Sequence, residues 1–356
     1  MDLDETASLL EVEDLVVHYP VGRGVLGMLA RRPKQVVHAV DGVSFSLADG
    51  EMLALVGESG CGKTTTAQAL MRMVDPFSGT IRFRGGEITG LAAGRMRPIR
   101  RKMQIIFQDP YESLDPRFRV RATVEEPLQV HGLGGSKEER RMLVHDALVR
   151  AGLTPPELFV DRYPHQLSGG QRQRVAIAAG LVLGPELLIA DEPVSMLDVS
   201  VRAGVLRLLD SLRRDGLGIL MITHDLSTAA HFADRIAVMY LGRIVEEGPA
   251  REVVKNPQHP YTRALLSVVP KPDPRDRARP QILGGETPDA VRIPSGCRFH
   301  PRCPIMVEDC KRIDPPLTPP AAATTPAHVA ACIRSEHTDL AELFGERAAT
   351  GSRAGR

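Results

Sequence analysis

The sequence lacks a long apolar segment and any large excess of charge, and its first residues lack the pattern of a secretory signal. No run approaches the roughly 18 to 20 uninterrupted apolar residues that span a bilayer, since the stretches at 181–190 and 219–222 are short. The N-terminus, MDLDETASLLEVEDL, is acidic and has no basic flank followed by an apolar stretch. We therefore expect a protein that stays in the cytoplasm and meets a membrane only peripherally.

The near absence of net charge also limits the partners. Lys and Arg total 45 against 44 Asp and Glu, which gives a formal net charge of +1. No bulk attraction to nucleic acid is indicated, and we expect no nucleic-acid partner. Apolar residues make up 43% and charged residues 25% of the 356 residues, as in a globular protein of one large or several smaller domains. In the cytoplasm the cysteines should be reduced.

Short apolar runs predict an α/β domain over residues 1–270. Residues 52–56 form a compact apolar run that ends at a glycine, and residues 63–73 contain no Pro or Gly, so a strand, a Gly-rich turn and a helix follow one another. Further strands are expected at 9–19, 40–47, 80–88, 187–190, 218–223 and 236–240, and a further helix at 201–214.

The amino-acid composition changes twice along the chain. Between about residues 95 and 174 the sequence is charged and helix-forming, with Ser136 and Glu139 spaced as a capping box, so we predict an inserted helical subdomain there. After Pro270 the segment PKPDPRDRARP is typical of a linker. It leads into a small cysteine-containing C-terminal region, 271–356, whose last ten or so residues we expect to be disordered.

The segment GESGCGKTT fits the phosphate-binding pattern G-x-x-x-x-G-K-[ST]. Its glycines let backbone N–H groups converge on phosphate, Lys63 can reach the β and γ oxygens, and Thr64 can bind magnesium. A chance Gly-rich turn is the alternative, which the predicted strand and helix on either side disfavour. Cys61 is interpreted as a small filler rather than a redox sensor. The predicted ATP-binding residues are Gly57, Glu58, Ser59, Gly60, Cys61, Gly62, Lys63, Thr64 and Thr65.

Two carboxylates follow a second apolar run, in LLIADEP at residues 187–193. We expect Asp191 to bind ATP-associated magnesium, directly or through water, and Glu192 to polarise the attacking water as a general base. Acidic residues at a strand end could also merely begin a turn. The phosphate loop elsewhere in the chain favours the catalytic interpretation.

With LSGGQ at residues 167–171 added, the chain resembles the nucleotide-binding subunits of ABC transporters over about residues 9–270. The resemblance implies a P-loop NTPase (RecA-like) ABC nucleotide-binding domain. In that family LSGGQ opens a helix that faces the γ-phosphate held by another subunit, which suits a Ser cap and closely approaching glycines. The residues implied to bind ATP in trans are Ser168, Gly169, Gly170, Gln171 and, in the D-loop SMLD, Asp198.

Further positions follow from the same resemblance. Gln108 in IFQDP resembles the Q-loop residue that senses magnesium and water, and His224 in LMITHDL resembles the switch histidine that stabilises the hydrolysis geometry. Tyr19 resembles the aromatic residue that stacks on adenine, with a packing role as the alternative. Met196 and Val194 depart from the alanine and threonine common in the family, but neither change removes a reacting group. We therefore predict a hydrolytically competent ATPase with Glu192 and His224 as catalytic residues.

The segment KNPQHPYTRALL, residues 255–266, resembles the extended C-terminal region of oligopeptide and dipeptide importer ATPases. The resemblance implies import of dipeptides or oligopeptides across the bacterial cytoplasmic membrane, with glutathione or nickel complexes as alternative cargo. It implies a peripheral place on the cytoplasmic face of the inner membrane. The implied partners are a second ATPase subunit, related or identical, two transmembrane permease subunits and an extracytoplasmic substrate-binding protein. A soluble ABC ATPase without permease is a further alternative, disfavoured because tandem cassettes and long coiled-coil insertions are absent.

Four cysteines in the C-terminal region have the spacing C-x5-C-x6-C-x21-C. Four thiolates suffice for one metal centre. The spacing lacks the C-x2-C typical of structural zinc, and related peptide importer ATPases carry a 4Fe-4S cluster here, so the resemblance favours iron–sulfur. Zinc and free buried cysteines remain alternatives. The residues are Cys297, Cys303, Cys310 and Cys332.

Overall fold

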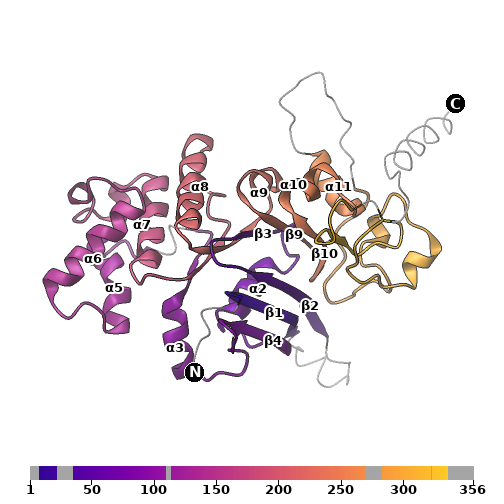
Figure 1. Ribbon diagram of the computed structural model, residues 1–356, viewed down its shortest axis with the longest axis horizontal. Coiled ribbons are helices and arrows are strands. Elements are labelled where there is room, and N and C mark those ends of the chain that lie inside the picture. The colour runs from indigo at the N-terminus through magenta and orange to yellow at the C-terminus, as the bar shows by residue number, and fades with distance from the viewer. Residues whose placement is uncertain (1–7, 22–34, 110–113, 269–282, 322, 336–356) are drawn as a thin grey trace, which may run out of the picture.

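The computed structural model describes residues 8–21, 35–109, 114–268, 283–321 and 323–335. A seven-stranded sheet runs through the middle of the molecule, with helices on both of its faces (Figure 1). Its five strands from β9 to β6 are parallel, and β10 and β11 join one edge as antiparallel strands. The order is β11 (Val329–Ala330), β10 (Arg243–Pro249), β9 (Arg235–Tyr240), β3 (Met52–Val56), β8 (Gly218–Thr223), β7 (Leu187–Asp191) and β6 (Met103–Ile106).

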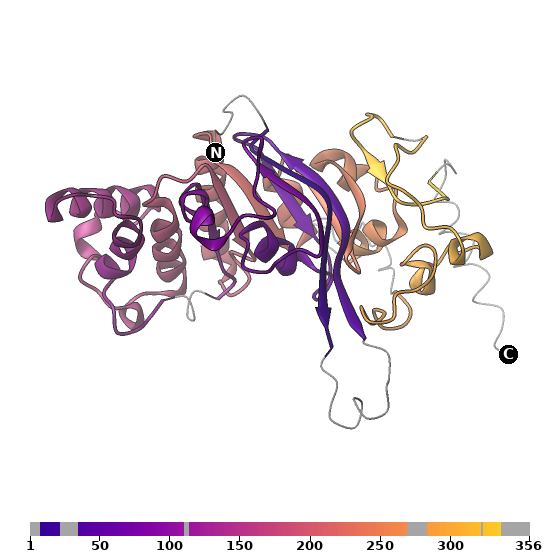
Figure 2. The same ribbon diagram turned by 90° about the horizontal axis from the view of Figure 1, so that it is seen from below.

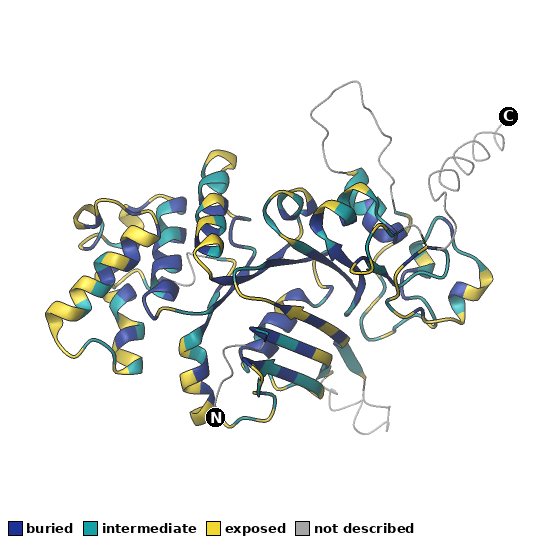
Figure 3. Ribbon diagram, in the orientation of Figure 1, coloured by how far each residue is buried: buried dark blue, intermediate teal, exposed yellow. Residues whose placement is uncertain are grey.

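The central strands are covered on both faces. Every residue of β3, β7 and β8 is buried, which explains their unbroken apolar sequences. Figure 3 shows the same contrast, with dark central strands and exposed outer faces on the surrounding helices. The predicted α/β class is confirmed.

A second, four-stranded antiparallel sheet lies beside the first, with α2 (Lys63–Leu70) between them (Figure 1). The side chains that fill this space include Leu10, Phe45, Leu70 and Ile222, which come from both sheets and from α2. The strand order is β2 (Val36–Leu47), β1 (Leu10–Pro20), β4 (Ser78–Phe83) and β5 (Gly86–Glu87).

Helices α5, α6 and α7 pack on one another at one end of the molecule, on the left of Figure 1. Ser136 caps α6 as predicted, because its Oγ accepts a hydrogen bond from the Glu139 backbone N–H at 3.0 Å. The Glu139 carboxylate instead accepts from the Gly135 N–H, so the capping box is only half formed. The bounds are α5 (Val120–His131), α6 (Lys137–Arg150), η1 (Pro156–Leu158), η2 (Pro164–Gln166) and α7 (Gly169–Leu181).

The charged stretch predicted as an insertion also contributes to the central sheet. Its first part forms α3 (Ala93–Lys102) and then β6, which pairs in parallel with β7. The four-residue strand follows a basic helix directly, so its apolar character is too brief to stand out in the sequence. Helix α2 ends three residues before position 73, because Arg72 adopts a left-handed φ of 52°. The boundaries at 95, 174 and 270 stay predictions.

The C-terminal residues pack against the edge of the central sheet. Residues Val329–Ala330 pair with β10, and Figure 2 shows this region at the end opposite the helical part. The predicted linker and the last ten residues lie outside the described residues. Within the described ranges, no helix is both long and apolar enough to cross a membrane. The remaining helices are α8 (Val199–Arg214), α9 (Leu226–Phe232), α10 (Ala250–Lys255), α11 (Pro260–Ser267), η3 (His300–Arg302) and η4 (Glu308–Lys311).

Candidate active site

The segment predicted to bind phosphate forms the turn between β3 and α2. Its glycines are required by close backbone contacts, since a Cβ at Gly57 would lie 2.2 Å from the Met239 carbonyl oxygen, and one at Gly62 would lie 2.1 Å from that of Ala39. Gly62 also has a φ of 108°, which other residues rarely adopt. No side chain caps α2, so the first N–H groups of the helix are available to an anion.

Lys63 lies folded over this turn. Its ammonium donates hydrogen bonds to the carbonyl oxygens of Gly57 at 2.8 Å and Glu58 at 2.9 Å, and the residue is 5% exposed. The neighbouring thiol of Cys61 is buried, and burial raises its pKa despite the nearby lysine. A thiol held in its neutral form suits the interpretation of Cys61 as a filler. Of the rest of the loop, Ser59, Gly60 and Thr64 are exposed, and Thr65 is half-buried.

Asp191 lies at the end of β7, beside Thr64. It is 3% exposed, and its Oδ1 has no hydrogen-bond partner among the described residues. Burial raises the pKa of Asp191, and the Thr64 hydroxyl lowers it only in part. A hydroxyl and a buried carboxylate with an unpartnered oxygen are the hard oxygen donors that magnesium prefers. These two residues therefore fit a magnesium ion.

Three predicted residues meet at the carboxyl ends of β6, β7 and β8. The Glu192 Oε2 accepts a hydrogen bond from the Gln108 side-chain nitrogen at 3.2 Å, and the His224 Nδ1 lies 3.2 Å from the same oxygen. Each residue follows one of three adjacent parallel strands, and parallel strands end on the same edge of a sheet. The carboxylate of Glu192 therefore lies between an amide and an imidazole.

Glu192 has an unusual backbone. Its φ of 47° is left-handed, and its N–H donates to the Ile222 carbonyl oxygen of the neighbouring strand. Such a conformation costs about 1–3 kcal/mol for a residue with a side chain and is typical of functional sites. At Glu192 this strained backbone conformation turns the carboxylate toward Gln108 and His224.

The LSGGQ segment opens α7 as predicted. The Ser168 Oγ accepts from the Gln171 N–H at 3.3 Å, and the Gln171 Oε1 accepts from the Ser168 N–H at 3.0 Å, so the capping box is complete. Gly169 is followed by Gly170, where a Cβ would lie only 2.1 Å from the Val201 side chain, so any larger residue would force Val201 to move. Among the described residues no hydrogen bond joins this segment to the phosphate loop of its own chain.

Two other predicted residues occupy less distinctive places. Asp198 is exposed and precedes α8 without forming a side-chain cap. Tyr19 lies near the end of β1 opposite Val37, half-buried, where it packs against the core beneath the small sheet. Packing is thus observed for Tyr19, and its stacking on adenine stays a prediction.

The triplet HPY within the KNPQHPYTRALL segment, His259 to Tyr261, contacts the phosphate loop directly, which the sequence did not predict. His259 caps α11, because its Nδ1 accepts from the Tyr261 N–H at 3.1 Å. The Tyr261 hydroxyl in turn accepts a hydrogen bond from the Glu58 N–H at 2.9 Å. From the C-terminal region, Arg302 forms an ion pair with the Glu58 carboxylate at 2.8 Å. The sequence marked Glu58 and the triplet separately but gave no sign that they meet.

The four C-terminal cysteines line one small pocket together with His259 and Phe299. All four are free thiols. Burial raises the pKa of Cys297 to about 11 and that of Cys303 to about 12, and it also raises the pKa of Cys332. The Arg334 N–H donates to the Cys332 sulfur. The structure therefore brings the four predicted cysteines together around one pocket.

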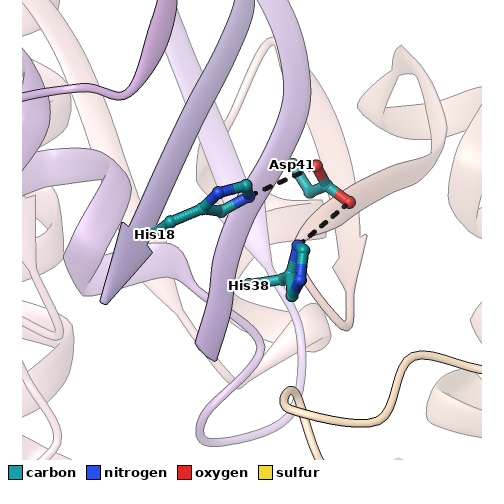
Figure 4. Close-up of side chains that lie close together, drawn as sticks. All are labelled: His18, His38 and Asp41. Carbon is teal, nitrogen blue, oxygen red and sulfur yellow. Dashed lines mark ion pairs between the residues drawn. The ribbon is translucent and has the colours of Figure 1, made fainter. Parts of the chain in front are cut away.

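Near the phosphate loop, His18, His38 and Asp41 point toward one another from β1 and β2 (Figure 4). The His18 Nε2 lies 3.7 Å and the His38 Nδ1 4.0 Å from the Asp41 carboxylate. Their ligand atoms are spaced closely enough for a metal ion. Arg298 already forms an ion pair with the same carboxylate and, despite burial, holds the pKa of Asp41 below its ordinary value. We interpret the group as a link between the small sheet and the C-terminal region.

Comparisons with known proteins agree with this geometry. Residues 40–195 match the ABC transporter family, and residues 245–310 match the oligopeptide/dipeptide transporter C-terminal region. A probable peptide ABC transporter ATP-binding protein of Sinorhizobium fredii is 46% identical over 94% of this chain and 94% of its own length. An oligopeptide transport ATP-binding protein of Bacillus subtilis is 44% identical over 91% of this chain and 97% of its own length.

Solved structures show the same fold. A dimeric, post-hydrolysis ATP-binding cassette bound to ADP and phosphate is 30% identical, with a TM-score of 0.59, and covers 68% of this chain and 99% of its own. An ABC transporter subunit from Clostridium perfringens is 31% identical over 70% of this chain and 91% of its own, with the same TM-score. The chain therefore belongs to the ATP-binding subunits of ABC transporters, in the branch that carries the oligopeptide/dipeptide C-terminal region, and is an ATPase of that family.

Proposed function

We propose that this ATPase powers the import of dipeptides or oligopeptides. The names of the relatives and the match of residues 245–310 to the oligopeptide/dipeptide C-terminal region support the choice of cargo. The observation that carries the catalytic part is the position of Glu192, held between Gln108 and His224 beside the phosphate loop.

In the proposed reaction Glu192 accepts a hydrogen bond from the attacking water and takes its proton as the water oxygen bonds to the γ-phosphorus. The bond between the γ-phosphorus and the oxygen that bridges to the β-phosphate breaks, and ADP leaves with the electron pair of that bond. Gln108 and His224 hold the carboxylate in place before reaction, and His224, which is 59% exposed, can turn to the γ-phosphate. Lys63 leaves its carbonyl partners for the phosphate oxygens. Lys63 and His224 thereby each exchange an oxygen acceptor of the protein for a more strongly charged phosphate oxygen.

Magnesium would be held by Thr64 and Asp191, and we assign Gln108, which contacts Glu192 next to Asp191 in the sequence, to sense it. The fit rests on the unpartnered buried Oδ1 of Asp191 beside a hydroxyl. When bound, the ion would neutralise charge on the phosphates. Tyr19 would stack on adenine at the end of β1.

A second ATPase subunit would complete the site. The helix α7 begins with a glycine pair and a satisfied Ser168 cap, and the N-terminus of such a helix attracts an anion. We assign Ser168, Gly169, Gly170, Gln171 and the exposed Asp198 to the ATP of a partner subunit, identical or related. The dimeric state of a similar cassette supports this arrangement.

The remaining partners and the place in the cell follow from the import function. Two permease subunits would receive force through the helices within residues 95–174, and an extracytoplasmic binding protein would deliver the peptide. The chain would then lie on the cytoplasmic face of the inner membrane. We assign residues 1–270 to the nucleotide-binding domain and 271–356 to the C-terminal region.

We further propose that Cys297, Cys303, Cys310 and Cys332 hold a 4Fe-4S cluster. Among the described residues, His18, His38 and Asp41 are the one group of at least three ligand atoms within 4.8 Å of one another, so no three of these sulfurs are that close. A single tetrahedral zinc, with Zn–S bonds of about 2.3 Å, needs sulfurs about 3.8 Å apart. The wider spacing around a shared pocket favours a cluster. Burial disfavours the charged thiolate form of the cysteines, and the positive iron ions of a cluster would balance that charge.

Substitution Glu192→Gln tests the catalytic assignment. The amide keeps the size of the side chain but cannot accept the proton, so we expect MgATP to bind with nearly unchanged affinity while hydrolysis falls by about 10²-fold or more. Asp215→Asn removes an exposed carboxylate at the end of α8 and is the matched control. Normal turnover in Glu192→Gln would refute the assignment.

The cluster is tested by anaerobic purification with analysis of iron, acid-labile sulfide and zinc. We expect about four irons and four sulfides per chain, with broad absorption near about 400 nm. Cys310→Ser should lose them, and Cys61→Ser should keep them. A colourless protein with stoichiometric zinc would overturn the cluster, leaving the ATPase assignment intact.

A further inference from the structure

A carboxylate within the phosphate loop is bound from outside by the C-terminal region. The Arg302 guanidinium contacts both carboxylate oxygens of Glu58, at 2.8 Å and 3.2 Å, and the Thr287 hydroxyl donates to one of them at 2.8 Å. Arg302 is 9% exposed at its side chain and also lies over the ring of Tyr240. The contact is a bidentate pair on a fixed, largely buried cation.

The charge of Glu58 gives this contact a consequence for ATP. Glu58 is the second residue of a loop whose purpose is to bind a polyanion, so its free carboxylate would repel the phosphates. Burial alone would raise the pKa of Glu58. The hydrogen bond and the charge of Arg302 nevertheless hold this pKa below its ordinary value. The carboxylate therefore stays charged, and its charge is balanced more by Arg302 than by Lys63, which contributes less.

The backbone of the same residue is bound from the same side. The Glu58 N–H donates to the Tyr261 hydroxyl at 2.9 Å, while the Glu58 carbonyl oxygen accepts from Lys63. Tyr261 is fully buried, so its hydroxyl is a fixed acceptor. The peptide group before Glu58 thus has one orientation.

We propose that Arg302 is a positioning residue for ATP binding: it draws the Glu58 carboxylate away from the phosphates and neutralises it. Tyr261 supports the same arrangement through the backbone. The C-terminal region, which contacts no reacting atom in this arrangement, then sets the affinity of the phosphate loop for MgATP.

Equilibrium binding of MgATP to the full-length chain tests the proposal, with Glu192→Gln as the background so that ATP is not consumed. Arg302→Ala should weaken binding about tenfold, which corresponds to about 1.4 kcal/mol, because an unbalanced carboxylate then faces the phosphates. Adding Glu58→Gln to that variant should restore the affinity to within about threefold. Arg302→Lys keeps the charge and should lose less affinity than Arg302→Ala.

The rescue separates charge balance from a purely structural role. If Arg302 only supported the fold, removing the second member of the pair would not restore binding, and the melting temperature would follow the affinity. Arg312→Ala, at an exposed arginine of the same region, is the matched control and should bind MgATP normally. Unchanged affinity in Arg302→Ala, or no rescue by Glu58→Gln, would overturn the proposal. Both outcomes leave the ATPase assignment unaffected, because that assignment rests on Glu192.

Discussion

The buried histidine of the HPY triplet should make the folded protein sensitive to mild acid. His259 is 1% exposed, and its Nδ1 accepts the hydrogen bond that caps α11. Burial lowers the pKa of His259 from 6.5 to about 3. The imidazole is therefore neutral in the folded protein at any pH at which the protein is handled.

The sign and size of the effect follow from proton linkage. Below its unfolded pKa of about 6.5, the histidine of the unfolded chain takes up a proton that the folded chain does not bind. The folded state then loses about 1.4 kcal/mol for each pH unit until the pH approaches the folded pKa near 3. Between about pH 7.5 and pH 5.0 the loss from this one group is about 2 kcal/mol.

Urea unfolding of wild type and His259→Asn at the two pH values measures this contribution. Asn is a good N-cap, so its side-chain oxygen can accept the Tyr261 N–H in place of the imidazole, and it does not titrate. The altered packing will change the free energy of unfolding of the variant by the same amount at both pH values. Its stability should fall by about 2 kcal/mol less than that of wild type when the pH is lowered.

The comparison cancels every other titrating group, since both proteins share them. The exposed His165 provides the matched control, and His165→Asn should show the pH dependence of wild type. Equal losses for wild type and His259→Asn would refute the reasoning, because they would mean that His259 is protonated in the folded state.

Three further substitutions test the site and the core. Gly62→Ala places a Cβ 2.1 Å from the Ala39 carbonyl oxygen at a φ of 108°, so MgATP titration should show no binding while circular dichroism shows a folded protein. Leu148→Ala, at a fully buried position of α6, should lower the free energy of unfolding in urea by about 2–5 kcal/mol; a loss below about 1 kcal/mol would contradict the packing. Glu246→Ala removes the acceptor of two backbone N–H groups, at Gln258 and His259, and should cost about 2–6 kcal/mol, measured against Glu126→Ala as an exposed control.

The local parts of the nucleotide site could be predicted from the sequence because each depends on a short stretch of chain. The pattern of the phosphate loop is contained within a few residues, although the contacts that require Gly57 and Gly62 come from the distant Met239 and Ala39. Ser168 and Gln171 form their capping box within one helical turn. The central strands were recognisable because burial on both faces demands uninterrupted apolar residues. Strand β6 was missed, since four apolar residues after a basic helix carry little periodicity.

The contacts between distant segments could not be predicted, because nothing in the local sequence specifies a partner far along the chain. Tyr261 and Arg302 are each more than two hundred positions from Glu58, and only the folding of the C-terminal region against the sheet brings them to the phosphate loop. The same holds for the meeting of Gln108, Glu192 and His224, which the order of β6, β7 and β8 decides.

The sequence by itself indicated the chemistry: a loop with the phosphate-binding pattern, a candidate general base after an apolar strand and a set of four cysteines. These features are local, since backbone conformation and side-chain type act over a few residues. Only the tertiary structure decided how these parts are connected. It placed Glu192 against Gln108 and His224, and it turned the charge of Glu58 toward Arg302. Such contacts depend on strand order and on packing between segments, and these are properties of the whole fold.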